Sequence, residues 1–123
     1  MITPVLNAVS QTSLEALLAH EPHALLITGP VGSGLATIAA HYTAGVKQHV
    51  WTVLPEKDEK IDLEKGTITI DSIRKLYDHT KTVEPNGRIV IIDYAERMAP
   101  AAQNAFLKLL EEPTVGTRFI LLT

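Results

Sequence analysis

The sequence predicts a three-layer α/β fold in which helices cover both faces of a mostly parallel sheet. Four short apolar runs, at 24–28, 49–54, 88–93 and 118–123, are nearly continuous rather than alternating, which is typical of strands buried on both faces. Helical patterns separate these runs, so strand and helix alternate along the chain, and this alternation favours parallel pairing.

The helices are indicated by apolar residues that recur every three or four positions. The first pattern begins at Thr12 and Glu15, which have the spacing of a capping box. We expect the third to begin at Asp71, an N-cap residue, and the last to run from Pro100 until Pro113 stops it. The apolar positions of the four patterns are Leu14, Leu17 and Leu18; Leu35, Ile38, Ala39 and Tyr42; Ile73, Leu76, Tyr77 and Thr80; and Ala102, Ala105, Phe106, Leu109 and Leu110.

Composition narrows the possible classes of function. We expect the 123 residues to form one domain, 1–123, and the charged stretch 55–66 to be its least ordered part. The net charge of -3 argues against tight binding of nucleic acid by this domain alone. Without cysteine, disulfides and thiolate zinc sites are excluded, and the five scattered histidines show no ligand spacing. No signal peptide or membrane span is indicated, so we expect a cytoplasmic protein.

A glycine-rich loop lies between the first predicted strand and the next helix, where a phosphate-binding loop belongs. Such loops need glycine because successive backbone N–H groups must point at phosphate oxygens. The first and last glycines have the spacing of G-x-x-x-x-G-K-[ST], and the helix start adds its positive dipole end. The candidate nucleotide-binding residues are Gly29, Pro30, Val31, Gly32, Ser33, Gly34, Leu35 and Ala36.

The last two positions of this motif depart from the pattern. Leu35 stands where a lysine would reach the β- and γ-phosphates, and Ala36 stands where a hydroxyl would hold Mg²⁺. Leu35 can also be interpreted simply as the first core residue of its helix. Both interpretations lead to the same conclusion, because a leucine contributes nothing to phosphate binding. A lost charged hydrogen bond costs about 1.5–3 kcal/mol, or roughly 10- to 150-fold in binding. We therefore expect weak ATP or ADP binding at most, and poor hydrolysis.

A second motif lies about sixty residues downstream. Four apolar residues, 89–92, place Asp93 at the carboxyl edge of the sheet, where ligands bind in such folds. In an active ATPase with this motif the next residue is usually a glutamate that polarises the attacking water, and here the residue is Tyr94. Asp93 is explained equally well as a strand-end or helix-capping aspartate when taken alone. Together with the glycine loop, it completes a nucleotide site that has lost two separate catalytic features.

The segment 93–113, DYAERMAPAAQNAFLKLLEEP, resembles the D-x-A-x-x-M … N-A-L-L-K-x-L-E-E-P signature of bacterial DNA polymerase III clamp-loader subunits. The segments HALLITGPVGSG (23–34), HVWTVLPEK (49–57) and ITIDSIRKLYD (68–78) fit the same family in the same order. The resemblance covers about 13–123, and N-A-F-L-K-L-L-E-E-P is its specific part.

This resemblance implies the P-loop NTPase core of an AAA+ protein, with strand order 2-3-4-1 and the first strand as an open edge. The family includes ATP-hydrolysing gamma/tau-type subunits and a delta-prime branch whose P-loop is often decayed. Leu35, Ala36 and Tyr94 make this chain resemble the delta-prime branch. Many members carry a four-cysteine zinc module before the second strand, which this chain lacks, so no zinc is expected.

The chain stops at Thr123, after what resembles the sensor 1 strand. A fifth strand, the Ser-Arg-Cys segment, the lid domain and the collar domain come later in the family, so we expect a fragment of a longer subunit. The polar face of the last helix, with Asn104, Lys108 and Glu111, is explained by solvation. The resemblance also suggests that this face looks toward a neighbouring subunit or DNA.

Three functional hypotheses follow from these patterns. The first is a non-hydrolysing structural subunit, the stator, that supports loading of the sliding clamp during DNA replication. Its partners would be the gamma/tau and delta subunits, with the sliding clamp and primer-template DNA reached through the assembled complex. The second is a gamma/tau-type subunit that binds and hydrolyses ATP with a divergent P-loop. The third is an unrelated P-loop module that binds a partner and no nucleotide.

Overall fold

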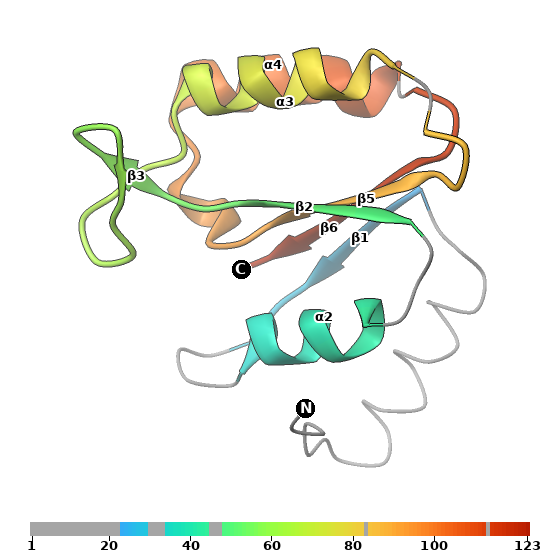
Figure 1. The fold of residues 1–123 in the computed structure, drawn as a ribbon. Coiled ribbons are helices and arrows are strands. Elements are labelled where there is room, and N and C mark those ends of the chain that lie inside the picture. The colour runs from blue at the N-terminus through green and yellow to red at the C-terminus, as the bar shows by residue number, and fades with distance from the viewer. Residues whose placement is uncertain (1–22, 30–33, 45–47, 83, 113) are drawn as a thin grey trace.

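The computed structural model describes residues 23–29, 34–44, 48–82, 84–112 and 114–123. Four strands form one sheet in which all neighbours are parallel, in the order β1-β6-β5-β2. Figure 1 shows two helices, α3 and α4, above the sheet and one helix, α2, below it. The bounds are β1 (Ala24–Ile27), α2 (Leu35–Thr43), β2 (His49–Val53), α3 (Ile70–Thr80), β5 (Arg88–Ile92), α4 (Pro100–Glu111) and β6 (Thr117–Leu122).

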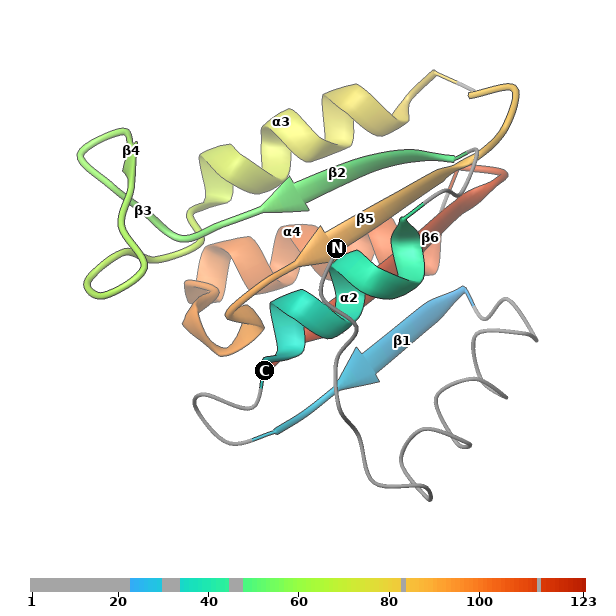
Figure 2. The same ribbon diagram turned by 60° about the horizontal axis from the view of Figure 1, so that its bottom comes forward.

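This arrangement confirms the predicted three-layer α/β fold. The four predicted strands are present, and their spatial order is the expected 2-3-4-1. Figure 2 shows the four strands side by side, with α2 crossing in front of them. Within the described residues β1 pairs with β6 alone, so the expected open edge is present there. The predicted helix around Leu14, Leu17 and Leu18 lies outside the described residues.

Residues 55–66, which we expected to be the least ordered, contain a two-stranded antiparallel hairpin. Its strands are β3 (Glu56–Lys57) and β4 (Lys60–Ile61). Asp58 and Glu59 at its tip have φ of 53° and 66°, as a tight two-residue hairpin turn requires. At its base a Cβ on Gly66 would lie 2.2 Å from the Asp62 carbonyl oxygen, so only glycine fits. The composition suggested disorder because charged side chains obscure a turn fixed by backbone geometry.

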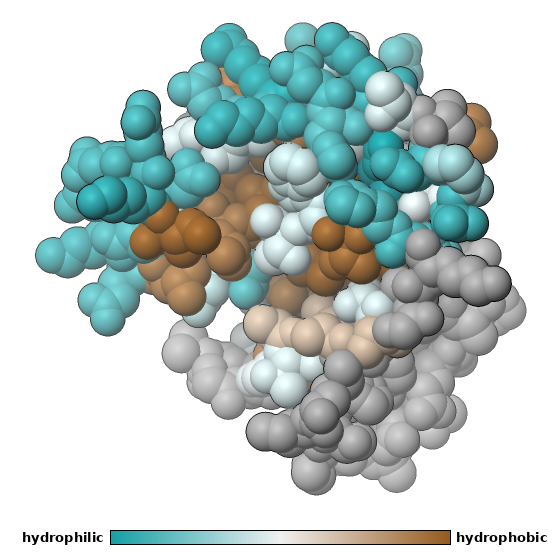
Figure 3. All heavy atoms as spheres, viewed as in Figure 1, coloured by the Kyte–Doolittle hydropathy of each residue, from teal (hydrophilic) through white to brown (hydrophobic). Residues whose placement is uncertain are grey.

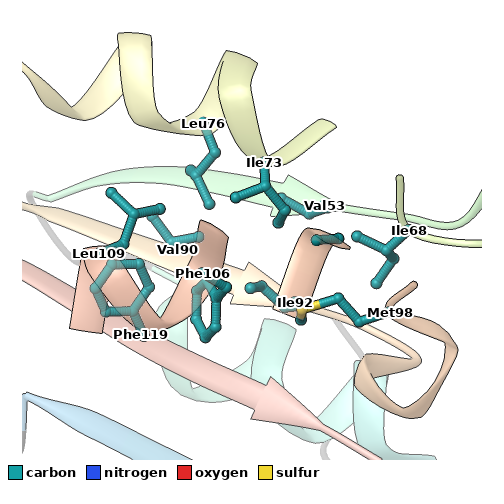
Figure 4. Close-up of a cluster of buried hydrophobic side chains, with 11 residues drawn as sticks. Val53, Ile68, Ile73, Leu76, Val90, Ile92, Met98, Phe106, Leu109 and Phe119 are labelled. Carbon is teal, nitrogen blue, oxygen red and sulfur yellow. The ribbon is translucent and has the colours of Figure 1, made fainter. Parts of the chain in front are cut away.

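The core lies mainly between the sheet and the α3–α4 layer. Val90 and Ile92 on β5 point to this face, whereas Ile89 and Ile91 point to α2, as a strand period of two requires. The Phe106 ring on α4 meets the Phe119 ring of β6 edge-on, with centroids 5.3 Å apart. Figure 4 shows this larger cluster. It contains Val53, Ile68, Ile73, Leu76, Val90, Ile92, Met98, Ala102, Phe106, Leu109 and Phe119.

Helix α3 corrects two expectations. Its N-cap is Thr69 rather than Asp71: the Thr69 hydroxyl accepts a hydrogen bond from the Ser72 backbone N–H at 3.3 Å. Asp71 lies one position inside the helix, where the positive dipole end favours a carboxylate. Tyr77, expected on the apolar stripe, is 50% exposed, and the Lys81 ammonium lies 4.9 Å from its ring centroid. None of the described helices is long and apolar enough to span a membrane.

Polar residues lie where three strands of the sheet begin, next to the core that α3 and α4 cover. His49, Arg88 and Thr117 begin three adjacent strands and are partners in register. Arg88 is 1% exposed, and its nearest carboxylate oxygen, from Glu84, lies 3.8 Å away. His79 from the last turn of α3 packs on the Trp51 ring at 4.0 Å between centroids. The buried guanidinium therefore lies near the last turn of α3, and its charge helps to lower the pKa of His79.

Candidate functional site

The two ends of the glycine loop lie where β1 ends and α2 begins. The Gly29 N–H donates to the carbonyl oxygen of Thr123 at 3.1 Å, which ties the start of the loop to the end of β6. Gly34 has φ of 78°, a left-handed conformation that glycine adopts without a Cβ clash. Its carbonyl accepts the first helical hydrogen bond, from Ile38 N–H at 2.9 Å. The loop residues Pro30, Val31, Gly32 and Ser33 lie outside the described residues.

Leu35 and Ala36 begin the helix that follows the loop. The Leu35 side chain is half-buried and packs against the apolar cluster of the α2 face, which contains Ile91 and Leu122. A side chain held by this packing is directed to the core and offers no charge to a phosphate. Ala36 is exposed and has no oxygen with which to hold Mg²⁺. Leu35 and Ala36 therefore lack the charged and hydroxyl groups that hold a Mg²⁺–nucleotide for catalysis.

A hollow of about 370 Å³ lies between α2 and β2 and brings the two motifs together. Ala36 from the glycine-loop helix and Asp93 from the end of β5 both line it. Neither Gly29 nor Leu35 does. The other described residues of its lining are apolar apart from two threonines: Ala39, Ala40, Thr43, Ala44, Val50, Thr52, Leu54, Ile91 and Leu122.

Among the described residues that line this hollow, Asp93 is the only ionisable one. Its backbone N–H donates to the Val53 carbonyl at 3.1 Å, which fixes it at the carboxyl end of the sheet. Burial raises the pKa of the Asp93 carboxyl above its usual range. The hydrogen bond from the Tyr94 backbone N–H, 2.9 Å long, opposes this shift, and the nearby Glu96 carboxylate adds to it. Among the described residues no lysine or arginine forms an ion pair with Asp93.

Tyr94 occupies the position after Asp93 in a left-handed conformation, with φ of 54°. This conformation is costly for a non-glycine residue and is held here by its surroundings. The Arg97 guanidinium lies 4.9 Å from the Tyr94 ring centroid, and it also donates a hydrogen bond to the Leu63 carbonyl of the hairpin segment. Glu96, two residues after Tyr94, is exposed.

Metal-binding chemistry has little support in the described part of the chain. His49 and His79 come within 5.2 Å between ring centroids, but the described residues hold no cluster of three or more histidine, aspartate or glutamate side chains suited to a metal ion. The sequence did not indicate that Val50 and Thr52 of β2 line the same hollow as Asp93. Their contribution depends on pairing between β2 and β5, and no local pattern encodes it.

Several known proteins are similar to this chain. The sequence model of a family described as "DNA polymerase III, delta subunit" matches residues 47–123. The chain is 29% identical to the DNA polymerase III subunit delta' of Pseudomonas aeruginosa, over 85% of this chain and 38% of that protein. It is 31% identical to the Replication factor C subunit 2 of Arabidopsis thaliana, over 94% of this chain and 34% of that protein.

A solved structure gives the same picture of the fold. The DNA polymerase III gamma subunit-related protein from Thermotoga maritima superposes with a TM-score of 0.67 and 26% sequence identity. The match covers 91% of this chain and 38% of that one. The chain thus spans less than two fifths of the length of each of these relatives.

Proposed function

The chain belongs to the clamp-loader family described as DNA polymerase III, delta subunit, and from this premise we propose that it acts as a non-hydrolysing structural subunit, a stator. In this role it would support loading of the sliding clamp during DNA replication without turning over ATP. Membership of this family excludes an unrelated P-loop module. It leaves open the choice between a stator and a gamma/tau-type ATPase.

One observation carries the proposal. Ala36 and Asp93 line the same hollow, so the remnants of both nucleotide-binding motifs face each other, yet among the described lining residues Asp93 supplies the only carboxylate for Mg²⁺ and Ala36 supplies no hydroxyl. Leu35 packs against the α2-face cluster, so the phosphate-binding lysine is replaced by a side chain that stabilises the fold instead. Tyr94 stands where a glutamate would orient the attacking water. Transition-state stabilisation in phosphoryl transfer relies on such groups, so turnover should be close to background.

The partners proposed for this subunit are the gamma/tau and delta subunits of the loader. The sliding clamp and primer-template DNA would be reached through the assembled complex. The net charge of -3 supports this indirect route, because a domain without net positive charge gains little from releasing counterions at the phosphate backbone.

A restoration experiment tests the proposal. Wild-type chain and the double variant Leu35→Lys/Ala36→Thr are titrated with a fluorescent ATP analogue and Mg²⁺, and phosphate release is followed in parallel. We expect the double variant to bind roughly 10- to 150-fold more tightly, because it regains one charged hydrogen bond to the phosphates. We expect phosphate release to stay near background in both proteins, because Tyr94 is unchanged.

A matched control is Leu35→Gln/Ala36→Thr, which disturbs the same packing but adds no charge and should gain little affinity. Adding Asp93→Asn to the restored variant should weaken the Mg²⁺ dependence of nucleotide binding, because one of the two oxygen ligands for the metal is lost. Efficient turnover by the wild-type chain would reject the stator and favour the alternative, an ATP-hydrolysing gamma/tau-type subunit with a divergent P-loop. Turnover only in the restored double variant would show that Tyr94 is not the limiting replacement.

A further inference from the structure

The outer edge of β2 carries backbone groups that pair with no other described strand. In the described part of the chain β2 pairs with β5 alone. The His49 N–H donates to Gly87, and the Val53 carbonyl accepts from Asp93, so the odd-numbered residues bond to β5. In a parallel ladder the intervening residues, Val50 and Thr52, then direct their N–H and C=O groups outward. This edge carries neither the lysine nor the proline by which exposed edges are commonly protected.

Two grooves flank this edge, one on each face of the sheet. On the α2 side lies the hollow of about 370 Å³ that contains Asp93. On the α3 side lies a groove of about 170 Å³, whose lining includes Trp51, Ile61 and Lys75. Thr52 and Leu54 line both. Figure 3 shows hydrophobic side chains gathered along this side of the molecule, between the polar surface above and the α2 layer below.

The geometry is that of a site for an added strand. Successive side chains of an extended peptide point to opposite faces of a sheet, so alternate residues of a strand beside β2 would enter the two grooves in turn. Val50 and Ile61, 37% and 62% exposed, are placed to receive apolar side chains. Backbone hydrogen bonds to Val50 and Thr52 would fix the register.

The charge of the site sets the chemistry of the partner. Of the described residues that line the α2-side hollow, Asp93 is the only one with an ionisable group, and the nearby Glu96 adds negative charge. Among the described residues no cation is paired with Asp93. A basic side chain entering at the carboxyl end of β2 would meet this carboxylate where water is partly excluded, and the ion pair is stronger there than on an open surface.

We propose that the free edge of β2 binds an extended segment of a partner protein, which adds as a further strand with alternate apolar residues and places a lysine or arginine against Asp93. This interaction needs no nucleotide and goes beyond the stator role. ATP turnover by the chain would reject the stator and leave this site standing, whereas failure of strand addition would leave the stator untouched.

The probe is a synthetic peptide of alternating valine and threonine with one lysine near its end. Its binding to the ¹⁵N-labelled chain is followed by chemical shifts and by amide hydrogen exchange. We expect slowed exchange at the outward-facing amides of Val50 and Thr52. Replacing the peptide lysine by glutamate should weaken binding at least about tenfold, and Asp93→Asn should abolish most of that difference.

Two controls isolate backbone pairing. Thr52→Pro removes an outward N–H and should abolish binding, whereas Thr52→Val keeps it and should bind as the wild type does. If Thr52→Pro fails to fold, a peptide N-methylated at alternate residues provides the same test on the wild-type chain and should not bind. Equal binding of the N-methylated peptide, exchange protection at another surface, no binding at millimolar peptide, or self-association of the chain through β2 would each overturn the proposal.

Discussion

The two faces of the sheet are covered unequally. On one face α3 and α4 bury an extended cluster, in which Phe106 and Phe119 contact each other directly. On the other, α2 lies alone among the described helices and buries a smaller cluster around Ala39, Ile91 and Leu122. Four strands spaced about 4.8 Å apart are wider than one helix of about 10 Å diameter, so a single helix cannot cover them.

The difference follows from the side chains that each helix contributes. Helix α4 places Phe106 and Leu109 on the sheet, whereas α2 turns Ala36, Ala39 and Ala40 toward β2 and leaves a hollow. Large buried side chains stabilise the fold, and small ones leave space for a ligand or a partner. The packed face therefore determines stability, and the face with the hollow carries the candidate binding surfaces, including Asp93.

The largest expected effect is on the packed face. Phe106→Ala should lower the free energy of unfolding by about 3–5 kcal/mol, because it removes a buried ring and leaves a cavity beneath α4. Phe106 is 4% exposed and contacts Phe119 edge-on. Urea denaturation followed by circular dichroism measures the change.

The matched control is the next residue of the same helix. Leu107 is 52% exposed, so Leu107→Ala should change stability by no more than about 0.5 kcal/mol. Equal losses in the two variants would mean that α4 packs differently on the sheet and that the comparison of faces is wrong.

A smaller effect, on the pH dependence of stability, is expected at His79, beside the buried Arg88. Burial lowers the pKa of His79 below its ordinary value of about 6.5, and the neighbouring Arg88 guanidinium and His49 lower it further, against the opposing Glu84 carboxylate. The unfolded chain therefore takes up a proton at His79 more readily than the folded one. The resulting stability is fully present above the unfolded pKa and is lost as pH falls through the folded value.

The corresponding test is the free energy of unfolding measured between about pH 7.5 and about pH 5. His79→Phe keeps an aromatic ring on Trp51 but cannot be protonated, so its stability should fall less steeply with acidification than that of the wild type. Parallel slopes for His79→Phe and wild type would exclude His79 as the source.

The fold could be predicted largely because its signals are local. Continuous apolar runs mark the four strands, and the recurrence of Ala102, Phe106 and Leu109 marks α4, since these periods follow from strand and helix geometry alone. The strand order rested on family resemblance. The burial of Arg88 was not predicted, and it depends on the end of α3 lying close to the start of β5. Such coverage depends on tertiary packing and has no signature in the sequence.

The candidate site could be predicted only in outline. The spacing of the glycine loop and the apolar run before Asp93 place Ala36 and Asp93 at the same sheet edge, and both line one hollow. The left-handed conformation of Tyr94 and the stacking of Arg97 were not foreseen, because residue type does not specify backbone conformation there. The contribution of β2 to the hollow was also missed, since it comes from a strand far away in the sequence.

The smallest expected effect distinguishes the two faces most directly, because the same substitution is made on each. Ala40 lines the α2-side hollow and is exposed, so Ala40→Leu can extend into free space and should change stability by less than about 0.5 kcal/mol. Ala102 is 0% exposed beneath α4, so Ala102→Leu should overpack the core and cost about 1–3 kcal/mol. Urea denaturation of both variants gives the comparison. A large loss at Ala40 would mean that another part of the chain fills the hollow, which would leave no room there for either nucleotide or an added strand.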